Sequence, residues 1–318
     1  MARPFIPWVG GKEKLIPYII SVFPTNVTQY VEPFGGGGSM ILNLPPDPKR
    51  LDIYNDLNSE LVNLFRCVKE RSNALLRELN VLPFHSREEF DRYKNFVSRR
   101  GSYFQNIDEE IAVLFDRSCF SAEQCAELLP IFEQRRELFD VQRAADYFKR
   151  AWGSFSGTTT SFGVKPLKLP KERIVDAAKR LENVVIEHKD AMELIEERDK
   201  EDSILYCDPP YYEAEKSYAV EFSRRYHVRL WKILCSCEGY VIVSYNDHPY
   251  IRNLYKDFFI LAFTRQNSMA QKVGAKYNEL LMTNYDPRRY MSPPNLFGSY
   301  VEDMKLVHIP KKPLKIIR

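Results

Sequence analysis

The chain has 318 residues, 44% of them hydrophobic, and a formal net charge of +3 at pH 7. These values describe a folded globular protein and exclude an intrinsically disordered chain. No apolar run approaches the roughly 18 residues of a membrane span, and residues 1–4 lack the apolar segment of a signal peptide, so we expect a cytoplasmic protein without membrane contact. The six cysteines are scattered, which favours buried thiols over a disulfide framework or a metal site.

The first stretch with functional residue types is Pro-Trp-Val-Gly-Gly-Lys at residues 7–12. Its two glycines allow a tight turn, Trp8 offers a flat apolar face, and Lys12 could meet a carboxylate. The alternative is a plain N-terminal turn with a core tryptophan. Apolar residues at helical spacing then predict a helix from about Glu13 to Val22.

A strand, a glycine loop and a helix come next. Residues 29–34 are a strand candidate, and Gly35 to Gly38 lead directly into a second apolar stretch. Glycines at this place let a ligand approach the backbone at a helix N-terminus. The dinucleotide fingerprint requires a further glycine where Met40 stands, so the sequence does not favour a pyrophosphate site.

The second strand candidate, Leu51 to Tyr54, ends just before Asp56. An acid at the end of a second strand can bind ribose hydroxyls. Ribose binding without a pyrophosphate site indicates an adenosine-type cofactor. The alternative is that Asn55 and Asp56 only cap the helix that starts near Ser59.

From about Glu60 to Lys149 the apolar spacing is helical, and no segment is strand-like. A helical block of this size between two strands of an α/β sheet is too long for a plain crossover. It therefore predicts an inserted, mostly helical domain.

The end of this block is basic, because residues 143–180 hold nine Lys or Arg and three acids. Within it, residues 151–163 mix small polar and aromatic side chains. Hydroxyls that reach base edges, flanked by cations that reach phosphates, are typical of a loop that reads nucleic acid. The alternative is a solvated linker between the insertion and the main domain.

Further strand candidates then resume the sheet, at residues 184–190, 204–207, 240–245, 258–263 and 280–285. Helical stretches near residues 172–181, 226–237 and 250–257 alternate with the earlier strands, which predicts an α/β fold. The last two strands flank a basic loop at residues 265–276 and predict a hairpin. The tail from Lys305 holds five cations and no acid, and we expect it to be solvated and mobile.

The motif that organises the chain follows the apolar run Ile204 to Cys207: Asp208-Pro209-Pro210-Tyr211. A carboxylate at the C-terminal end of a parallel strand sits where open α/β sheets bind ligands, and the prolines keep the backbone out of helix. Such a site suits an amino group on a flat heterocycle: carboxylate and carbonyl accept its two N–H bonds, and Tyr211 stacks on the ring. The alternative is a strand end that merely turns.

Four separated motifs together resemble the Dam-type DNA adenine methyltransferases, the α-ordered class of amino-methylating enzymes. They are residues 8–12, Glu32-Pro33-Phe34 with the glycines, residues 55–58 and residues 208–211. The resemblance implies a Rossmann-like α/β methyltransferase sheet in residues 1–60 and 166–318. It also implies a mostly helical target-recognition insertion at residues 61–165.

The resemblance further implies S-adenosylmethionine as methyl donor, double-stranded DNA as partner, and a flipped adenine as methyl acceptor. The cofactor residues would be Trp8, Lys12, Phe34, Gly36, Gly38, Asp56 and Asp190. The catalytic residues would be Asp208, Pro209, Pro210 and Tyr211, with Phe222, His227 and Leu230 on a helix that lines the pocket. For DNA contacts we single out Arg150, Ser154, Thr158, Thr159, Thr160, Lys165 and Lys168.

The chain departs from the family in its more glycine-rich loop and in a reading loop unlike that of enzymes that recognise GATC, so the target sequence does not carry over. Three rival functions stay open at this point. These are cytosine N4 or RNA methylation, a nicotinamide-dependent oxidoreductase, and a DNA-binding module without activity. Carbon-5 cytosine methylation is excluded because no Pro-Cys dipeptide is present. The residues leave open the oligomeric state and whether a cognate restriction endonuclease is a partner.

Overall fold

The computed structural model describes residues 2–8, 12–81, 121–154, 171–213, 222–266, 276–291 and 303–315. The chain divides into two compact units. The first unit comprises residues 1–4, 8–62 and 180–318, and the second comprises residues 5–7 and 63–179. The predicted insertion at residues 61–165 overlaps the second unit but ends earlier in the chain.

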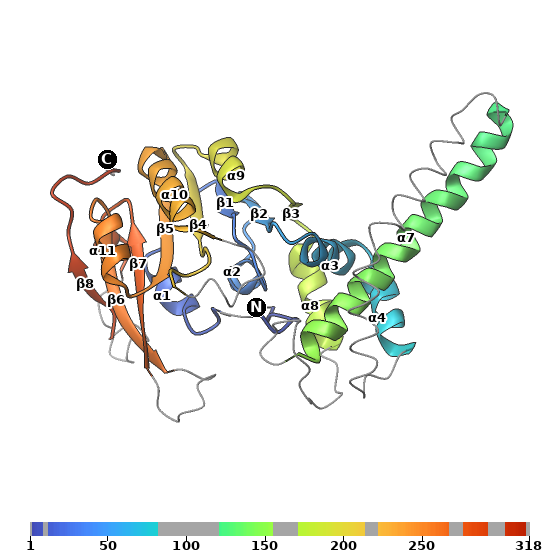
Figure 1. Cartoon of the computed structure of the whole chain (residues 1–318), viewed down its shortest axis with the longest axis horizontal. Helices are drawn as coiled ribbons and strands as arrows, with labels where there is room; N and C mark the ends of the chain where they lie inside the picture. Colours follow the sequence, from blue (N-terminus) through green and yellow to red (C-terminus); the bar gives the residue numbers. More distant parts are fainter. Residues whose placement is uncertain are drawn as a thin grey trace. The chain divides into compact units, whose positions relative to one another are not determined.

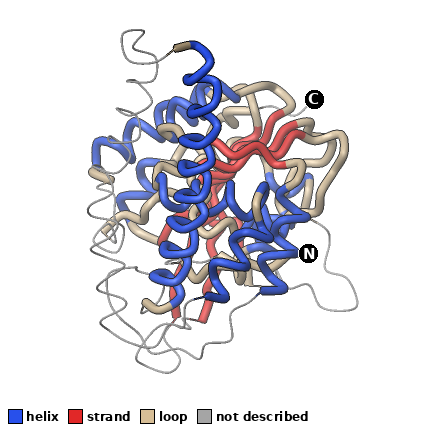
Figure 2. The backbone as a smooth tube through the Cα atoms, turned by 90° about the vertical axis from the view of Figure 1, so that its right-hand side faces the viewer, coloured by secondary structure: helices blue, strands red, loops and turns tan. Residues whose placement is uncertain are grey.

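The first unit is built on an eight-stranded sheet in the order β3-β2-β1-β4-β5-β7-β6-β8 (Figure 1). Strands β3, β2, β1, β4 and β5 are parallel, whereas β7 pairs antiparallel with both β5 and β6, and β8 pairs antiparallel with β6. The bounds are β1 Gln29–Glu32, β2 Leu51–Asn55, β3 Val184–Glu187, β4 Ser203–Cys207, β5 Tyr240–Asn246, β6 Phe259–Gln266, β7 Lys276–Thr283 and β8 Lys305–His308. Figure 2 shows the strands following one another across a twisted sheet, as expected for L-residues. The predicted α/β fold is confirmed.

The strand order reverses between β1 and β4. From β1 the chain adds β2 and then β3 on one side, and it crosses to place β4 and β5 on the other. Ligands of open α/β sheets bind outside the carboxyl ends of the strands at such a switch point. The glycine loop after β1 and Asp208 after β4 therefore lie at the same place.

Three helices pack on the sheet and close the main apolar core of the first unit. They are α9 (Ala191–Arg198), α10 (Arg224–Ser236) and α11 (Pro249–Leu254). Helix α10 illustrates the pattern, because His227, Leu230 and Leu234 are its buried residues and share one face. Strand β4 is buried along its whole length, which explains why its sequence is apolar from Ile204 to Cys207, directly before Asp208.

Two further short helices precede and follow β1 in the chain. Helix α1 spans Ile16–Ser21. It is shorter than the predicted helix because residues 13–15 form a turn and the helix begins only at Ile16, directly before Pro17. Helix α2 spans Ser39–Asn43 and follows the glycine loop directly, as predicted.

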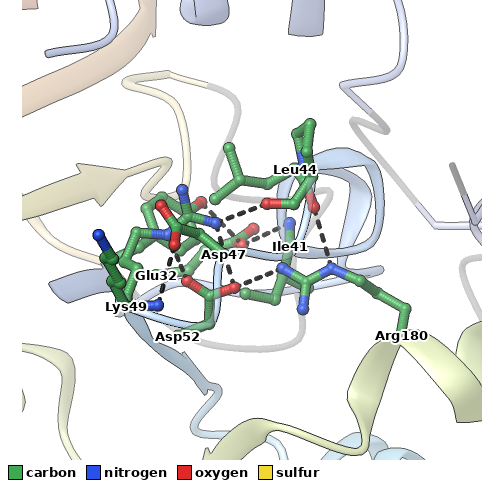
Figure 3. Close-up of polar contacts among 10 residues, drawn as sticks. Glu32, Ile41, Leu44, Asp47, Lys49, Asp52 and Arg180 are labelled. Carbon is green, nitrogen blue, oxygen red and sulfur yellow. Dashed lines mark hydrogen bonds and ion pairs between the residues drawn. The ribbon is translucent and has the colours of Figure 1, made fainter. Parts of the chain in front are cut away.

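A buried ion-pair cluster ties β2 to the loop after α2 (Figure 3). Asp52 Oδ2 accepts a bond of 2.6 Å from Arg180, and Asp52 Oδ1 accepts one of the same length from Arg50. Arg180 also donates to the Leu44 carbonyl at 2.9 Å. The cluster is a structural anchor, since each buried charge has a partner of opposite sign.

The C-terminal tail differs from the prediction. Instead of being solvated and mobile, it contributes β8, which pairs with β6 at the edge of the sheet. The backbone N–H of Lys315 donates to the Asn284 carbonyl at 2.9 Å, and its ammonium lies 4.5 Å from the centre of the Tyr240 ring. The charge count was a poor guide here because an edge strand can expose its cations and still form a ladder.

The second unit is helical in all its described elements apart from short connections, as predicted. Its helices are α3 (Ser59–Glu70), α4 (Ser72–Val81), α7 (Ala122–Trp152) and α8 (Lys171–Leu181), although residues 59–62 of α3 and 180–181 of α8 are assigned to the first unit. Helix α7 begins with a capping box in which Ser121 and Gln124 bond reciprocally. Asn63 of α3 donates to the Asp140 carbonyl of α7 at 2.9 Å. Residues 82–120, for which helices were also predicted, lie outside the described part.

Two other differences concern a helix that was not predicted and the ends of two strands. Helix α9 was not predicted, and β6 and β7 pair up to Gln266 and Lys276, farther into the predicted basic loop than expected. The hairpin itself is confirmed. Within the described ranges, no helix is both long and apolar enough to cross a membrane.

Candidate active site

Asp208 lies directly after β4, and its two carboxylate oxygens have different surroundings. Oδ1 accepts a hydrogen bond from the Ser244 hydroxyl at 2.7 Å and lies 3.1 Å from the Lys12 ammonium. No described residue donates to Oδ2, and 19% of the side chain is exposed. The site thus fixes one oxygen and leaves the other able to accept a bond from a ligand.

The charge of Asp208 depends on these neighbours. Burial raises the pKa of the Asp208 carboxyl, whereas Lys12 and Ser244 lower it because they stabilise the carboxylate. Ser244 is itself held by a 3.1 Å hydrogen bond with the Tyr206 hydroxyl.

Tyr211 is fixed at both its ring and its hydroxyl. The hydroxyl donates to Glu279 Oε2 of β7 at 2.6 Å, and the Lys12 ammonium lies 4.1 Å from the centre of the ring. Burial raises the pKa of the Tyr211 phenol well above its usual value, so the group stays a neutral donor. Lys12 therefore touches two members of the Asp208–Tyr211 motif.

The glycine loop packs between two aromatic side chains. Gly36 has φ +49°, and a Cβ there would lie 2.6 Å from Trp8 Nε1. A Cβ on Gly35 would lie 2.2 Å from the Tyr54 ring, and the Tyr54 hydroxyl donates to the Gly36 carbonyl at 2.7 Å. Gly38, with φ +68°, precedes α2. Only glycine fits this close approach, which accounts for the run of glycines.

Asp56 connects the glycine loop to the end of β2. Its Oδ2 accepts from the Gly36 N–H at 2.9 Å, and its Oδ1 accepts from the Asn58 N–H at 2.8 Å. Burial raises the pKa of Asp56, while these two donors oppose the rise. Each carboxylate oxygen can accept a second bond, so the arrangement is compatible with a ribose hydroxyl. The helix-cap alternative is not supported, because Asn58 accepts from the N–H groups of Glu60 and Leu61.

Asp190 caps helix α9, since its Oδ1 accepts from the N–H groups of Met192 and Glu193. Lys189, the residue before Asp190, is hydrogen-bonded to Asn55 at the end of β2. The Asn55 amide donates to the carbonyls of Pro33 and Lys189 at 2.9 and 3.1 Å. Asn55 thereby joins the carboxyl ends of β1, β2 and β3.

Aromatic side chains border this edge of the sheet. Phe34 meets Phe222 edge to face with ring centres 5.9 Å apart. His227 lies 4.8 Å from the Phe222 ring, and its Nδ1 is 2.7 Å from the Tyr245 hydroxyl. Leu230 is fully buried one turn farther along α10.

The candidate DNA-contacting residues fall in the second unit. Thr158, Thr159, Thr160, Lys165 and Lys168 lie outside the described residues. Arg150 is partly buried, which lowers the pKa of its guanidinium. Ser154 is fully buried and donates to the Ala151 carbonyl at 2.9 Å, an arrangement that does not favour contact with a base edge.

Sequence reasoning missed Ser244 and Glu279, which hold Asp208 and Tyr211. Both are buried; Ser244 interrupts an apolar strand run between Val243 and Tyr245, whereas Glu279 follows Asn278 directly before the apolar part of β7. That interruption was a usable signal, because buried polar groups are retained only with hydrogen-bond partners.

Comparison with known proteins agrees with this fold. Residues 8–269 match the family model of the D12 class N6 adenine-specific DNA methyltransferases, and the chain belongs to this family. It is therefore an enzyme that transfers a methyl group to the N6 amine of adenine in DNA. The match favours adenine over the rival targets and excludes the oxidoreductase alternative.

Three similar proteins are also methyltransferases or methylases by name. The type II methyltransferase M1.LlaDCHI of Lactococcus lactis subsp. cremoris is 29% identical over 89% of this chain and 95% of its own length. The type II methyltransferase M.MjaIII of Methanocaldococcus jannaschii is 24% identical over 89% and 99%. The DNA adenine methylase of Serratia marcescens is 26% identical over 88% and 97%.

Proposed function

We propose that the chain methylates a flipped adenine at Asp208-Pro209-Pro210-Tyr211 with S-adenosylmethionine as the methyl donor. The observation that carries this assignment is the asymmetry of Asp208. Its Oδ1 is held by Ser244 and Lys12, and its Oδ2 has no donor among the described residues. An exocyclic amine can donate one N–H to Oδ2 and the other to the Pro209 carbonyl.

These hydrogen bonds are the source of the reactivity. The lone pair of an aromatic amine is conjugated into its ring, which makes the amine a poor nucleophile. Two acceptors favour the pyramidal form and direct the lone pair toward the methyl group. Positioning and electrostatics then supply most of the acceleration, and no covalent enzyme intermediate is needed. The proton leaves to Asp208 or to water late in the reaction.

The residues around the glycine loop suit an adenosine-type donor. The backbone of the glycine loop packs directly against the Trp8 ring, with Gly36 at positive φ, and Asp56 retains acceptor capacity for a ribose hydroxyl. When bound, S-adenosylmethionine supplies an electrophilic methyl sulfonium. In this proposal Trp8, Lys12, Phe34, Gly36, Gly38, Asp56 and Asp190 surround it, with Lys12 also stabilising the Asp208 carboxylate.

Duplex DNA is the proposed substrate, and the target adenine leaves the base stack because its amine is otherwise buried within the helix. Tyr211 would stack on the flipped base. Residues Thr158 to Thr160 would read base edges, and Lys165, Lys168 and Arg150 would contact phosphates. A cognate restriction endonuclease is the proposed biological partner, in line with the type II names of two relatives.

Replacing the acceptor tests the assignment. Asp208→Ala should abolish methyl transfer from tritiated S-adenosylmethionine to DNA while calorimetry shows cofactor binding largely intact. Asp247→Ala is the matched control, because Asp247 follows β5 and pairs with Arg252 at 2.6 Å at a partly exposed position, where an ion pair contributes little. Near-wild-type turnover of Asp208→Ala would refute the role of Asp208.

A further inference from the structure

The segment after the catalytic carboxylate is held by one pair of facing residues. In the antiparallel ladder of β5 and β7, Asn246 and Glu279 are direct partners. Facing residues of a ladder project to the same side of the sheet. Two consecutive tyrosines follow Pro210, and each of the two side chains forms a hydrogen bond with one of them.

The two bonds secure different parts of this dipeptide. Glu279 Oε2 accepts a hydrogen bond from the Tyr211 hydroxyl at 2.6 Å, and the Asn246 amide donates to the Tyr212 carbonyl at 3.1 Å. Glu279 is 1% exposed and Tyr211 is 8% exposed, so water does not compete strongly for the bond. A short bond to a buried carboxylate is among the stronger hydrogen bonds in proteins.

We propose that Asn246 and Glu279 are positioning residues that hold Tyr211 and Tyr212 in the conformation needed for methyl transfer. This inference rests on the proposed function, in which the Tyr211 ring stacks on the flipped adenine. Glu279 fixes the far end of the ring and Asn246 fixes the backbone behind it. The antiparallel part of the sheet thus sets the geometry of a motif that belongs to the parallel part.

Loss of either contact should reduce chemistry more than binding, because a ring displaced by about 1 Å can cost roughly a hundredfold in rate. We expect Glu279→Ala to lower the single-turnover rate at least tenfold and to change the Kd for S-adenosylmethionine less than twofold. Glu279→Gln keeps an oxygen acceptor and should recover much of the rate. Asn246→Ala should also slow the single-turnover rate.

A double-mutant cycle separates positioning from a general structural role. Tyr211→Phe removes the same hydrogen bond from the other end and keeps the ring, so it should slow transfer about as much as Glu279→Ala. In the Tyr211→Phe background, Glu279→Ala should then have less than a twofold effect. Asn246→Ala should remain harmful there, because it acts through the Tyr212 carbonyl.

The control is Tyr285→Phe, which removes a buried hydroxyl bond of 2.5 Å to the Val22 carbonyl away from Asp208 and should leave the rate unchanged. A wild-type rate for Glu279→Ala, or equal losses in both Tyr211 backgrounds, would overturn the proposal. If Glu279→Ala does not fold, the rates of Glu279→Gln and Tyr211→Phe are compared instead. A wild-type rate for Tyr211→Phe would then overturn the proposal. Asp208→Ala in the same assay tests the proposed function separately.

Discussion

At the scale of single residues, the charge of Asp208 is a balance between burial and two neighbours. Burial favours the neutral acid, and Lys12 and Ser244 favour the carboxylate. Since the proposed role requires an acceptor, activity should fall when the pH drops through the pKa of Asp208. Because that pKa is raised, the loss should occur at a higher pH than for an exposed aspartate.

Ser244→Ala should move the acidic limb of the pH–rate profile to higher pH, because it removes a donor that lowers the pKa of Asp208. The measurement is the single-turnover methyl-transfer rate as a function of pH. Ser236→Ala is the control, since the exposed Ser236 hydroxyl at the end of α10 donates to the Ile233 carbonyl at 2.8 Å. An acidic limb that stays in place would show that Ser244 does not tune Asp208.

Glu32 presents a second residue-scale case. Its Oε2 accepts from the Tyr30 hydroxyl and from the Ile41 N–H at 3.0 and 2.9 Å, yet burial raises the pKa of Glu32 from 4.5 to about 8. Between these pH values the unfolded chain has lost the proton and the folded protein keeps it. Glu32 should therefore destabilise the fold progressively as the pH rises from about 4.5 to about 8.

Glu32→Gln should reduce this pH dependence, because glutamine is neutral and can still accept both bonds. The test compares free energies of unfolding in urea at about pH 5 and pH 8 for both proteins. We expect a smaller loss between the two pH values in the variant. Identical losses would mean that Glu32 stays ionised in the folded protein.

At the scale of elements, the glycine loop and the end of β2 form one structure through Asp56. Asp56→Ala should weaken S-adenosylmethionine binding by about 1.5–3 kcal/mol, the range for loss of a hydrogen bond to a charged group. Titration calorimetry measures this directly. Asp202→Ala is a matched control, because Asp202 lies at the amino end of β4 and its carboxylate accepts a hydrogen bond from the Thr28 hydroxyl. Unchanged affinity for Asp56→Ala would reduce Asp56 to a structural link within the loop.

At the scale of the whole molecule, the net charge of +3 conceals a local excess of six cations in residues 143–180. If Lys165 and Lys168 contact phosphates, Lys165→Ala should weaken binding to all DNA sequences alike and lower the slope of log K against log salt by about one. Lys200→Ala, an exposed cation at the amino end of β4, should leave the slope unchanged.

Replacement of Thr158, Thr159 and Thr160 by alanine is the companion experiment. It should change which sites are methylated and leave non-specific affinity nearly unchanged, since each lost base contact costs about 1–3 kcal/mol of discrimination. Sequencing of the methylated DNA reads the outcome. An unchanged site preference and rate would identify residues 158–160 as a linker.

Much of the first unit follows from local patterns. Apolar runs marked seven of the eight strands, and the turn after Cys207 marked the end of β4. The glycines at 35–38 and the acids at 56 and 208 were visible as candidate ligands because loops at strand ends carry function. Strand β8 was missed because four residues of mixed polarity at an edge lack a periodic signal.

The order of the strands was decided only by the tertiary structure. No local pattern states that β1 lies between β2 and β4, yet this adjacency is what brings the glycine loop beside Asp208. The same holds for Ser244 and Glu279, which are 36 and 68 residues away in sequence from their partners Asp208 and Tyr211. A sequence shows that a buried serine or glutamate needs a partner, because desolvation of an unpaired polar group is costly. Which partner it finds depends on the register of strands that are distant in the chain.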